Sequence, residues 1–131
     1  MAVTRVLLDT HVLLWALTEP EKLSPRARGL IEDLKTTVLV SSASAWEIAT
    51  KHRLGRLPEA ETVVHGYQNH LAALRATELA ITGEHALRAG SMRDPHRDPF
   101  DRMLAAQALI EGVHLVTSDP AFSAFPVKTI W

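Results

Sequence analysis

Hydrophobic residues along the chain fall into two kinds of run. Five short runs rich in Val, Leu and Ile are typical of strands, and they lie at residues 3–9, 37–42, 77–81, 113–119 and 127–131. The longer segments between them carry apolar residues at every third or fourth position, which is the spacing of one helix face. Strands that alternate with helices predict a mostly parallel sheet covered on both faces. We therefore expect an α/β/α sandwich with about five strands in its central sheet.

The helices are predicted from their ends as well as from their spacing. Ser24 and Asp98 each precede a proline, as an N-cap residue does when proline occupies the first helical position. Gly55 and Gly112 each stop an apolar helical pattern, where a left-handed glycine commonly ends a helix. We expect helices at residues 10–17, 24–36, 44–57, 58–76, 82–92 and 98–112.

Composition narrows the class of protein. The length of 131 residues suggests a single domain over residues 1–131. The absence of cysteine excludes disulfides, thiolate metal sites and cysteine nucleophiles, and it fits a cytoplasmic location. The apolar start is interrupted by Arg5 and Asp9, so we expect neither a membrane span nor a signal peptide. With 14 basic and 15 acidic residues, any nucleic-acid surface has to be local.

Four acidic residues fall at corresponding places in the predicted fold. Asp9 ends the first strand, and Asp119 ends the fourth. Glu47 lies in the first turns of the helix after the second strand, and Asp101 lies in the first turn of the helix before the fourth. In open α/β sheets, ligands bind outside the carboxyl ends of the strands. We therefore expect all four acids at one edge of the sheet.

Each acid also has a purely structural interpretation. Asp9 can cap a helix, Asp98 and Asp101 together form a capping pattern, and Glu47 can pair with a lysine one turn later. Asp119 precedes a proline, which is an ordinary turn signal. Taken together, however, four such coincidences at one edge of the sheet are less convincing than a shared function.

Clustered carboxylates need a compensating charge, because otherwise they repel and some take up protons. A divalent cation supplies that charge, and oxygen ligands without cysteine suit Mg²⁺ or Mn²⁺. Acid-rich sites of this kind typically act on phosphodiesters, where the metal activates a water molecule and stabilises the charge of the transition state.

Four stretches together resemble one known family. They are "LLDTHVLLW" at 7–15, "SSASAWEIATKHRLGRL" at 41–57, "DPFDRMLAAQA" at 98–108 and "LVTSD" at 115–119. In this order they resemble the PIN-domain ribonucleases, and most closely the VapC-type toxins of bacterial toxin–antitoxin pairs. They span nearly the whole chain, and although each stretch alone is weak, the set is specific.

The resemblance implies that Asp9, Glu47, Asp101 and Asp119 are the metal ligands and that Thr117 supports the site through its hydroxyl. It implies a Mg²⁺- or Mn²⁺-dependent endoribonuclease that leaves a 5′-phosphate and a 3′-hydroxyl on its RNA substrate. It further implies a homodimer that is neutralised by a cognate antitoxin.

Other residues of the motifs receive secondary roles. Ser41, Ser44 and Trp46 are interpreted as turn, cap and core residues. His11 and His96 lie near the acids, where they can touch RNA, order a water molecule or stay solvated. The chain also has two groups of basic residues. Such groups are usually solvated, but beside a carboxylate site they can position phosphates. They are Lys51, His52, Arg53 and Arg56, and Arg88, Arg93, Arg97 and Arg102.

Three other classes of protein remain as alternatives. A phosphoacceptor signalling domain, which is receiver-like, fits the length and the positions of Thr117 and Lys128, but it needs an acidic pair after the first strand and an aspartate after a middle strand. An aspartate-nucleophile phosphatase needs an aspartate where His11 stands. A purely structural interaction domain leaves the clustered acids unexplained.

Overall fold

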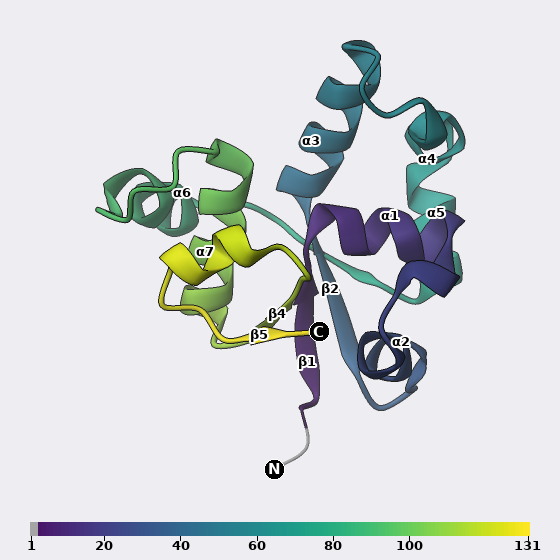
Figure 1. Cartoon of the computed structure of the whole chain (residues 1–131), viewed down its shortest axis with the longest axis horizontal. Helices are drawn as coiled ribbons and strands as arrows, with labels where there is room; N and C mark the ends of the chain where they lie inside the picture. The colour runs from purple at the N-terminus through teal and green to yellow at the C-terminus, as the bar shows by residue number, and fades with distance from the viewer. Residues whose placement is uncertain (1–2) are drawn as a thin grey trace.

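The computed structural model describes residues 3–131 and has a five-stranded sheet at its centre (Figure 1). All neighbouring strands are parallel, and their order is β3-β2-β1-β4-β5. The strands are β1 (Arg5–Leu8), β2 (Thr37–Ser41), β3 (Thr77–Leu79), β4 (His114–Val116) and β5 (Thr129–Ile130). The expected α/β/α fold with a parallel sheet of about five strands is confirmed.

Helices cover both faces of the sheet, with α6 and α7 on one side and α1, α2 and α5 on the other (Figure 1). The α-helices are α1 (Thr10–Thr18), α2 (Pro25–Glu32), α3 (Ser42–Arg53), α4 (Glu61–His65), α5 (Tyr67–Leu74), α6 (Gly83–Ser91) and α7 (Pro99–Glu111). Three short 3₁₀ segments are η1 (Pro20–Lys22), η2 (Pro58–Ala60) and η3 (Pro120–Ala124).

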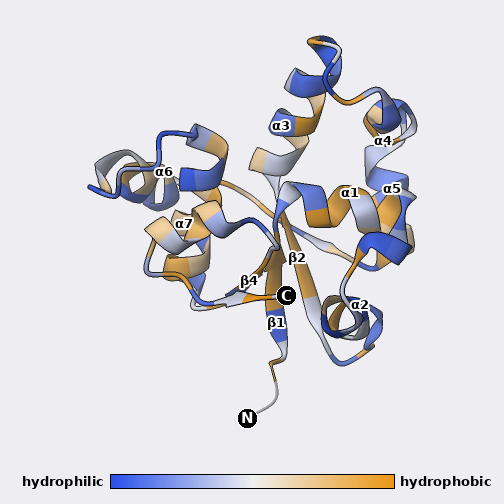
Figure 2. Ribbon diagram, in the orientation of Figure 1, coloured by the Kyte–Doolittle hydropathy of each residue, from blue (hydrophilic) through white to orange (hydrophobic). Residues whose placement is uncertain are grey.

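Alternate residues of β1 enter two hydrophobic cores. Val6 and Leu8 pack with the residues of α1, α2 and β2, and Ile48 of α3 joins the same core. Leu7 points to the other face, where α7 and η3 cover it. All three β1 residues are fully buried, as expected for a parallel sheet with both faces covered. Figure 2 shows the same pattern, with hydrophobic strands inside and hydrophilic helix surfaces outside.

The predicted helix at 58–76 is wrong, because the chain forms η2, α4 and α5 there instead. The break between α4 and α5 lies at Gly66, whose backbone is non-helical with φ −135°. Glycine costs about 1 kcal/mol in a helix interior relative to alanine, so it is a favourable place for the chain to turn. The apolar spacing survives the break because Val63 and Leu71 still reach the same core.

The helix ends at Gly55 and Gly112 are confirmed, since both glycines have a left-handed backbone, with φ +74° and +66°. The helix expected from residue 44 begins earlier, at Ser42, because the Ser41 hydroxyl caps it by accepting from the backbone N–H of Ala43 at 3.0 Å.

The strand order also decides against the receiver-like alternative. Flavodoxin-like signalling domains have the order 2-1-3-4-5, whereas this sheet has β1 between β2 and β4. Lys128 directly precedes β5 and lies level with the start of β4, whereas Thr117 follows the end of β4, so the two residues lie at opposite ends of these strands.

Among the helices of residues 3–131, none combines the length and the apolar character that a membrane span requires.

Candidate active site

Asp9 lies where the order of the sheet reverses, between β1 and β4. Its backbone N–H still donates to the carbonyl of Val116 at 3.0 Å, which fixes the residue to the end of β4. Its carboxylate accepts from the backbone N–H of Thr10 and from the hydroxyl of Thr117, both at 2.7 Å. Burial raises the pKa of Asp9, and the charge of Glu47 adds to this effect, while the two hydrogen bonds oppose it. The Thr117 hydroxyl therefore contacts Asp9 directly, in line with the supporting role predicted for it.

Glu47 extends from α3 toward the same edge and is 4% exposed. The helix is held against α1 by a hydrogen bond of 2.9 Å between the hydroxyls of Ser44 and Thr10. One carboxylate oxygen of Glu47 is paired with the ammonium group of Lys51, which is the i,i+4 pair expected from the sequence. The other oxygen, Oε1, is buried and has no hydrogen-bond partner among residues 3–131. A buried carboxylate oxygen without a partner is costly, so it marks a place where a ligand atom or ion fits.

Asp98 and Asp101 make different contacts at the start of α7. Oδ1 of Asp98 caps the helix by accepting from the backbone N–H groups of Phe100 at 2.9 Å and of Asp101 at 3.2 Å. Oδ2 of Asp101 instead lies 2.7 Å from Nε2 of His96. Burial raises the pKa of Asp101 to about 6, and the charges of Asp98, Asp9 and Glu47 contribute, while the His96 hydrogen bond lowers it.

Asp9, Glu47 and Asp101 thus lie at the same edge of the sheet, near enough for the charge of Glu47 to raise the pKa of both aspartates and for the charge of Asp9 to raise the pKa of Asp101. The carboxylate of Asp119 is engaged elsewhere: it is exposed, and its Oδ1 caps η3 by accepting from the backbone N–H of Ala121 at 2.9 Å. Its backbone N–H donates to Oγ1 of Thr117 at 3.0 Å. Asp119 is therefore connected to the site through its main chain, and its role as a ligand stays a prediction.

Residues 6–128 match the family model described as PIN domain. The chain belongs to the PIN-domain family. Among known proteins, this PIN domain is 33% identical over 117 residues to Ribonuclease VapC22 of Mycobacterium tuberculosis, a match that covers 88% of each protein. It is also 33% identical to Ribonuclease VapC16 of the same organism over 58 residues, which are 44% of this chain and 41% of that protein.

Solved structures show the same fold at lower identity. VapBC2 from Rickettsia felis, crystallised with a DNA fragment from its promoter, aligns with a TM-score of 0.67 and 16% identity over 97% of this PIN domain and 98% of that chain. FitAcB from Neisseria gonorrhoeae aligns with a TM-score of 0.63 and 23% identity over 96% of each chain.

The carboxylates of this PIN domain are suitable ligands for a divalent cation, but their side chains are not positioned around a single point. Within residues 3–131, no three His, Asp or Glu side chains are close enough to coordinate a single ion. Lys51 and His96 contact two of the carboxylates instead. The donor set contains only hard oxygen ligands, its members repel one another, and Oε1 of Glu47 lacks a partner. A bound cation would resolve these unfavourable features together once the side chains move toward it.

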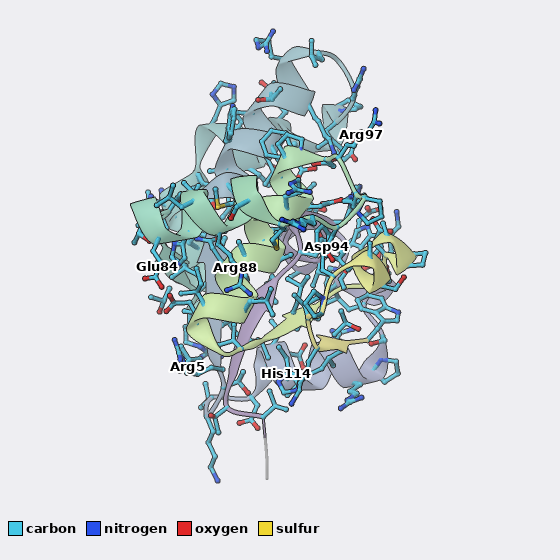
Figure 3. The ribbon with its side chains drawn as sticks, turned by 90° about the vertical axis from the view of Figure 1, so that its left-hand side faces the viewer. Arg5, Glu84, Arg88, Asp94, Arg97 and His114 are labelled. Carbon is cyan, nitrogen blue, oxygen red and sulfur yellow. The ribbon has the colours of Figure 1, made fainter. Side chains whose placement is uncertain are left out.

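Arg102 has a role that the sequence did not reveal. From the sequence it was either a solvated residue or one that can position phosphates, whereas in the structure its guanidinium group donates to backbone carbonyls of its own chain. The accepting residues are Ala89, Met92, Asp94 and His96. Arg102 thereby fixes the loop between α6 and α7. This loop contains His96, which contacts Asp101. Figure 3 shows this side of the PIN domain, with Asp94 and Arg97 labelled on the loop.

Aromatic side chains near the site also depart from expectation. Trp46, which was predicted to be a core residue, is 62% exposed. Its ring meets that of Phe100 edge to face, with the ring centres 4.8 Å apart. Trp15 is partly buried against the core. His11 is exposed beside it and lies close enough to Asp9 to lower the pKa of that residue slightly.

Proposed function

We propose that this PIN domain is a Mg²⁺- or Mn²⁺-dependent endoribonuclease and the toxin of a toxin–antitoxin pair. The observation that carries the proposal is the group of Asp9, Glu47 and Asp101 at the switch point of the sheet, with a buried Glu47 oxygen that has no partner. Its relatives in Mycobacterium tuberculosis are named ribonucleases, which supports RNA as the substrate.

Asp9, Glu47 and Asp101 would hold the cation, and Asp119 would join them if its carboxylate leaves its cap. A divalent cation in such a site neutralises charge on the scissile phosphate and promotes attack by water. We expect products with a 5′-phosphate and a 3′-hydroxyl. Thr117 keeps the Asp9 carboxylate oriented through its 2.7 Å hydrogen bond, and Lys51 neutralises Glu47 when no cation is present.

We further propose a homodimer, a cognate antitoxin as the partner and the cytoplasm as the place of action. Structural neighbours support the antitoxin, since one is described as a toxin–antitoxin complex from Klebsiella pneumoniae, with a TM-score of 0.61. Sedimentation of the purified chain tests the dimer. Co-expression with the short reading frame next to its gene, followed by a growth assay, tests the antitoxin.

The central experiment compares RNA cleavage by the wild type, Asp9→Asn and Asp101→Asn, with Mg²⁺, with Mn²⁺ and with EDTA. We expect cleavage by the wild type only, and only with metal, because each variant removes one negative charge from the cation site. Asp33→Asn is the matched control, since this exposed aspartate follows α2 at the opposite edge of the sheet. The metal should also raise the melting temperature of the wild type by mass action and have less effect on Asp9→Asn. Cleavage at wild-type rates by both site variants would overturn the assignment.

A further inference from the structure

The ion pair between Lys51 and Glu47 differs from an ordinary surface pair. The two residues lie four positions apart on α3, and the side chain of Lys51 is 26% exposed while that of Glu47 is 5% exposed. The pair of Arg28 and Glu32 has the same spacing on α2, but its side chains are 48% and 62% exposed. Exposed pairs contribute little to stability, whereas a buried carboxylate that loses its partner keeps an uncompensated charge. Lys51 therefore compensates the charge of a carboxylate that has little access to water.

The ammonium group of Lys51 also lies within electrostatic range of the start of α7. Burial lowers the pKa of Lys51, but the hydrogen bond to Glu47 and the charge of Glu47 outweigh this effect. The charges of Asp98 and Asp101 raise the pKa of Lys51 as well. Lys51 therefore interacts with two of the three acids that are proposed to hold the cation, Glu47 directly and Asp101 through its charge.

Lys51 occupies only half of the Glu47 carboxylate. Its ammonium group contacts Oε2, whereas Oε1 is buried without a hydrogen-bond partner among residues 3–131. A divalent cation carries twice the charge of an ammonium group and coordinates several carboxylate oxygens at once. Such a cation competes with Lys51 for Glu47, and once it is bound the two like charges repel each other.

A lysine side chain can change partners without movement of the backbone, because its four-carbon stem is flexible and its ammonium group has three donors. Release from Glu47 leaves the ammonium group of Lys51 beside the site, where the phosphates of a bound RNA are the next available anions. We propose that Lys51 is exchanged between two anions: it pairs with Glu47 while no cation is bound, and it binds an RNA phosphate once a divalent cation occupies the carboxylates. This inference rests on the proposed ribonuclease function and adds a residue that lowers the metal affinity and positions the substrate.

Metal binding tests the first half of the exchange without RNA. Mn²⁺ is titrated by isothermal calorimetry into the wild type, Lys51→Met and Lys51→Arg. Lys22→Met is the matched control, because Lys22 pairs with Glu19 at 3.1 Å but the two side chains are 51% and 39% exposed. We expect Lys51→Met to bind Mn²⁺ on the order of 10-fold more tightly, since it removes a like charge from a partly buried site, where charges are screened less than in water. Lys51→Arg keeps the charge and should bind Mn²⁺ no more tightly than the wild type, and Lys22→Met should bind it equally well.

RNA cleavage at saturating Mn²⁺ tests the second half of the exchange. The salt dependence of kcat/KM is measured between about 50 and 200 mM salt, because each phosphate that a protein cation neutralises adds to the slope of the logarithmic plot. We expect the slope for Lys51→Met to be smaller by roughly 0.7–0.9, which corresponds to the loss of one phosphate contact. Lys51→Arg should retain the slope, because a guanidinium group also binds phosphate. A merely structural role of Lys51 would lower kcat/KM without changing its salt dependence.

The exchange is overturned if Lys51→Met binds Mn²⁺ no more tightly than the wild type, or if its salt dependence is unchanged. In both cases, metal-dependent cleavage by the wild type would still support the ribonuclease function. If the wild type neither binds Mn²⁺ nor cleaves RNA, both proposals fail. Should Lys51→Met not fold by circular dichroism, acetylation of lysines in the wild type decides, with Lys22 as the internal reference. Mn²⁺ should make Lys51 more reactive, because its amine no longer donates to Glu47, and unchanged reactivity at saturating Mn²⁺ would contradict the exchange.

Discussion

Replacing Asp101 with asparagine should stabilise the metal-free protein at neutral and alkaline pH. The pKa of Asp101 is about 6 in the folded protein, compared with a reference value of 3.8. The folded state therefore binds this proton more tightly than the unfolded state, and stability decreases as pH rises through this interval. Above about pH 6 the full cost of a charged Asp101 is present, whereas asparagine never carries that charge.

The size of the gain follows from the shift in pKa. A difference of about 2 pH units corresponds to about 3 kcal/mol. The Asp101 side chain remains 14% exposed at the surface, so solvent screening reduces the expected gain to ~1–2 kcal/mol. For a chain of this size, that gain raises the melting temperature by roughly 4–7 °C. The amide oxygen of asparagine can still accept the hydrogen bond from His96, so little packing should be lost.

The assay is urea denaturation of the wild type and Asp101→Asn in EDTA at about pH 4.5 and about pH 8, with Asp33→Asn as the control. The gain should be present at the higher pH and small at the lower one. Adding Mn²⁺ should then stabilise the wild type more than the variant, because the cation replaces the proton as the compensating charge. The reasoning is refuted if Asp101→Asn is less stable than the wild type at the higher pH, or if its gain is the same at both.

Three further changes test the contacts around the site. Asp98→Ala should cost about 0.5–2 kcal/mol of stability through the lost cap, measured by urea denaturation, whereas Asp98→Asn should restore most of it. Arg102→Met should cost about 2–4 kcal/mol and speed proteolysis of the preceding loop, because several partly buried carbonyls lose a charged donor; an equally resistant loop would contradict this. Thr117→Val should reduce cleavage at least about tenfold and lower the affinity for Mn²⁺, because Asp9 loses its orienting hydrogen bond, while Thr117→Ser should retain both.

Local chemistry explains which features could be predicted from the sequence. Asp98 and Gly112 act on their own helix ends, so a few neighbouring residues determine their conformation. The strands were predictable because a parallel sheet buried on both faces requires continuous apolar runs, as in β1. Asp9 could be placed because the carboxyl end of a central strand is a fixed position in this class of fold.

The features that were missed depend on contacts between distant segments. Nothing near Arg102 in the sequence distinguishes an arginine that binds carbonyls from one that binds phosphates. Trp46 occupies a helix position that looks like a core residue, and only the placement of α7 decides that its partner is Phe100.

The contact made by Arg102 has a consequence for how the site loses its function. Asp9 and Thr117 are fixed to the central strands, whose amides should exchange with solvent only on global unfolding. His96, which contacts Asp101, lies instead on the connecting loop before α7, and the guanidinium group of Arg102 holds that loop in place. The two sides of the site therefore belong to regions of unequal opening free energy. On gentle heating, the loop that contains His96 should open first, and activity should be lost while the sheet is still intact.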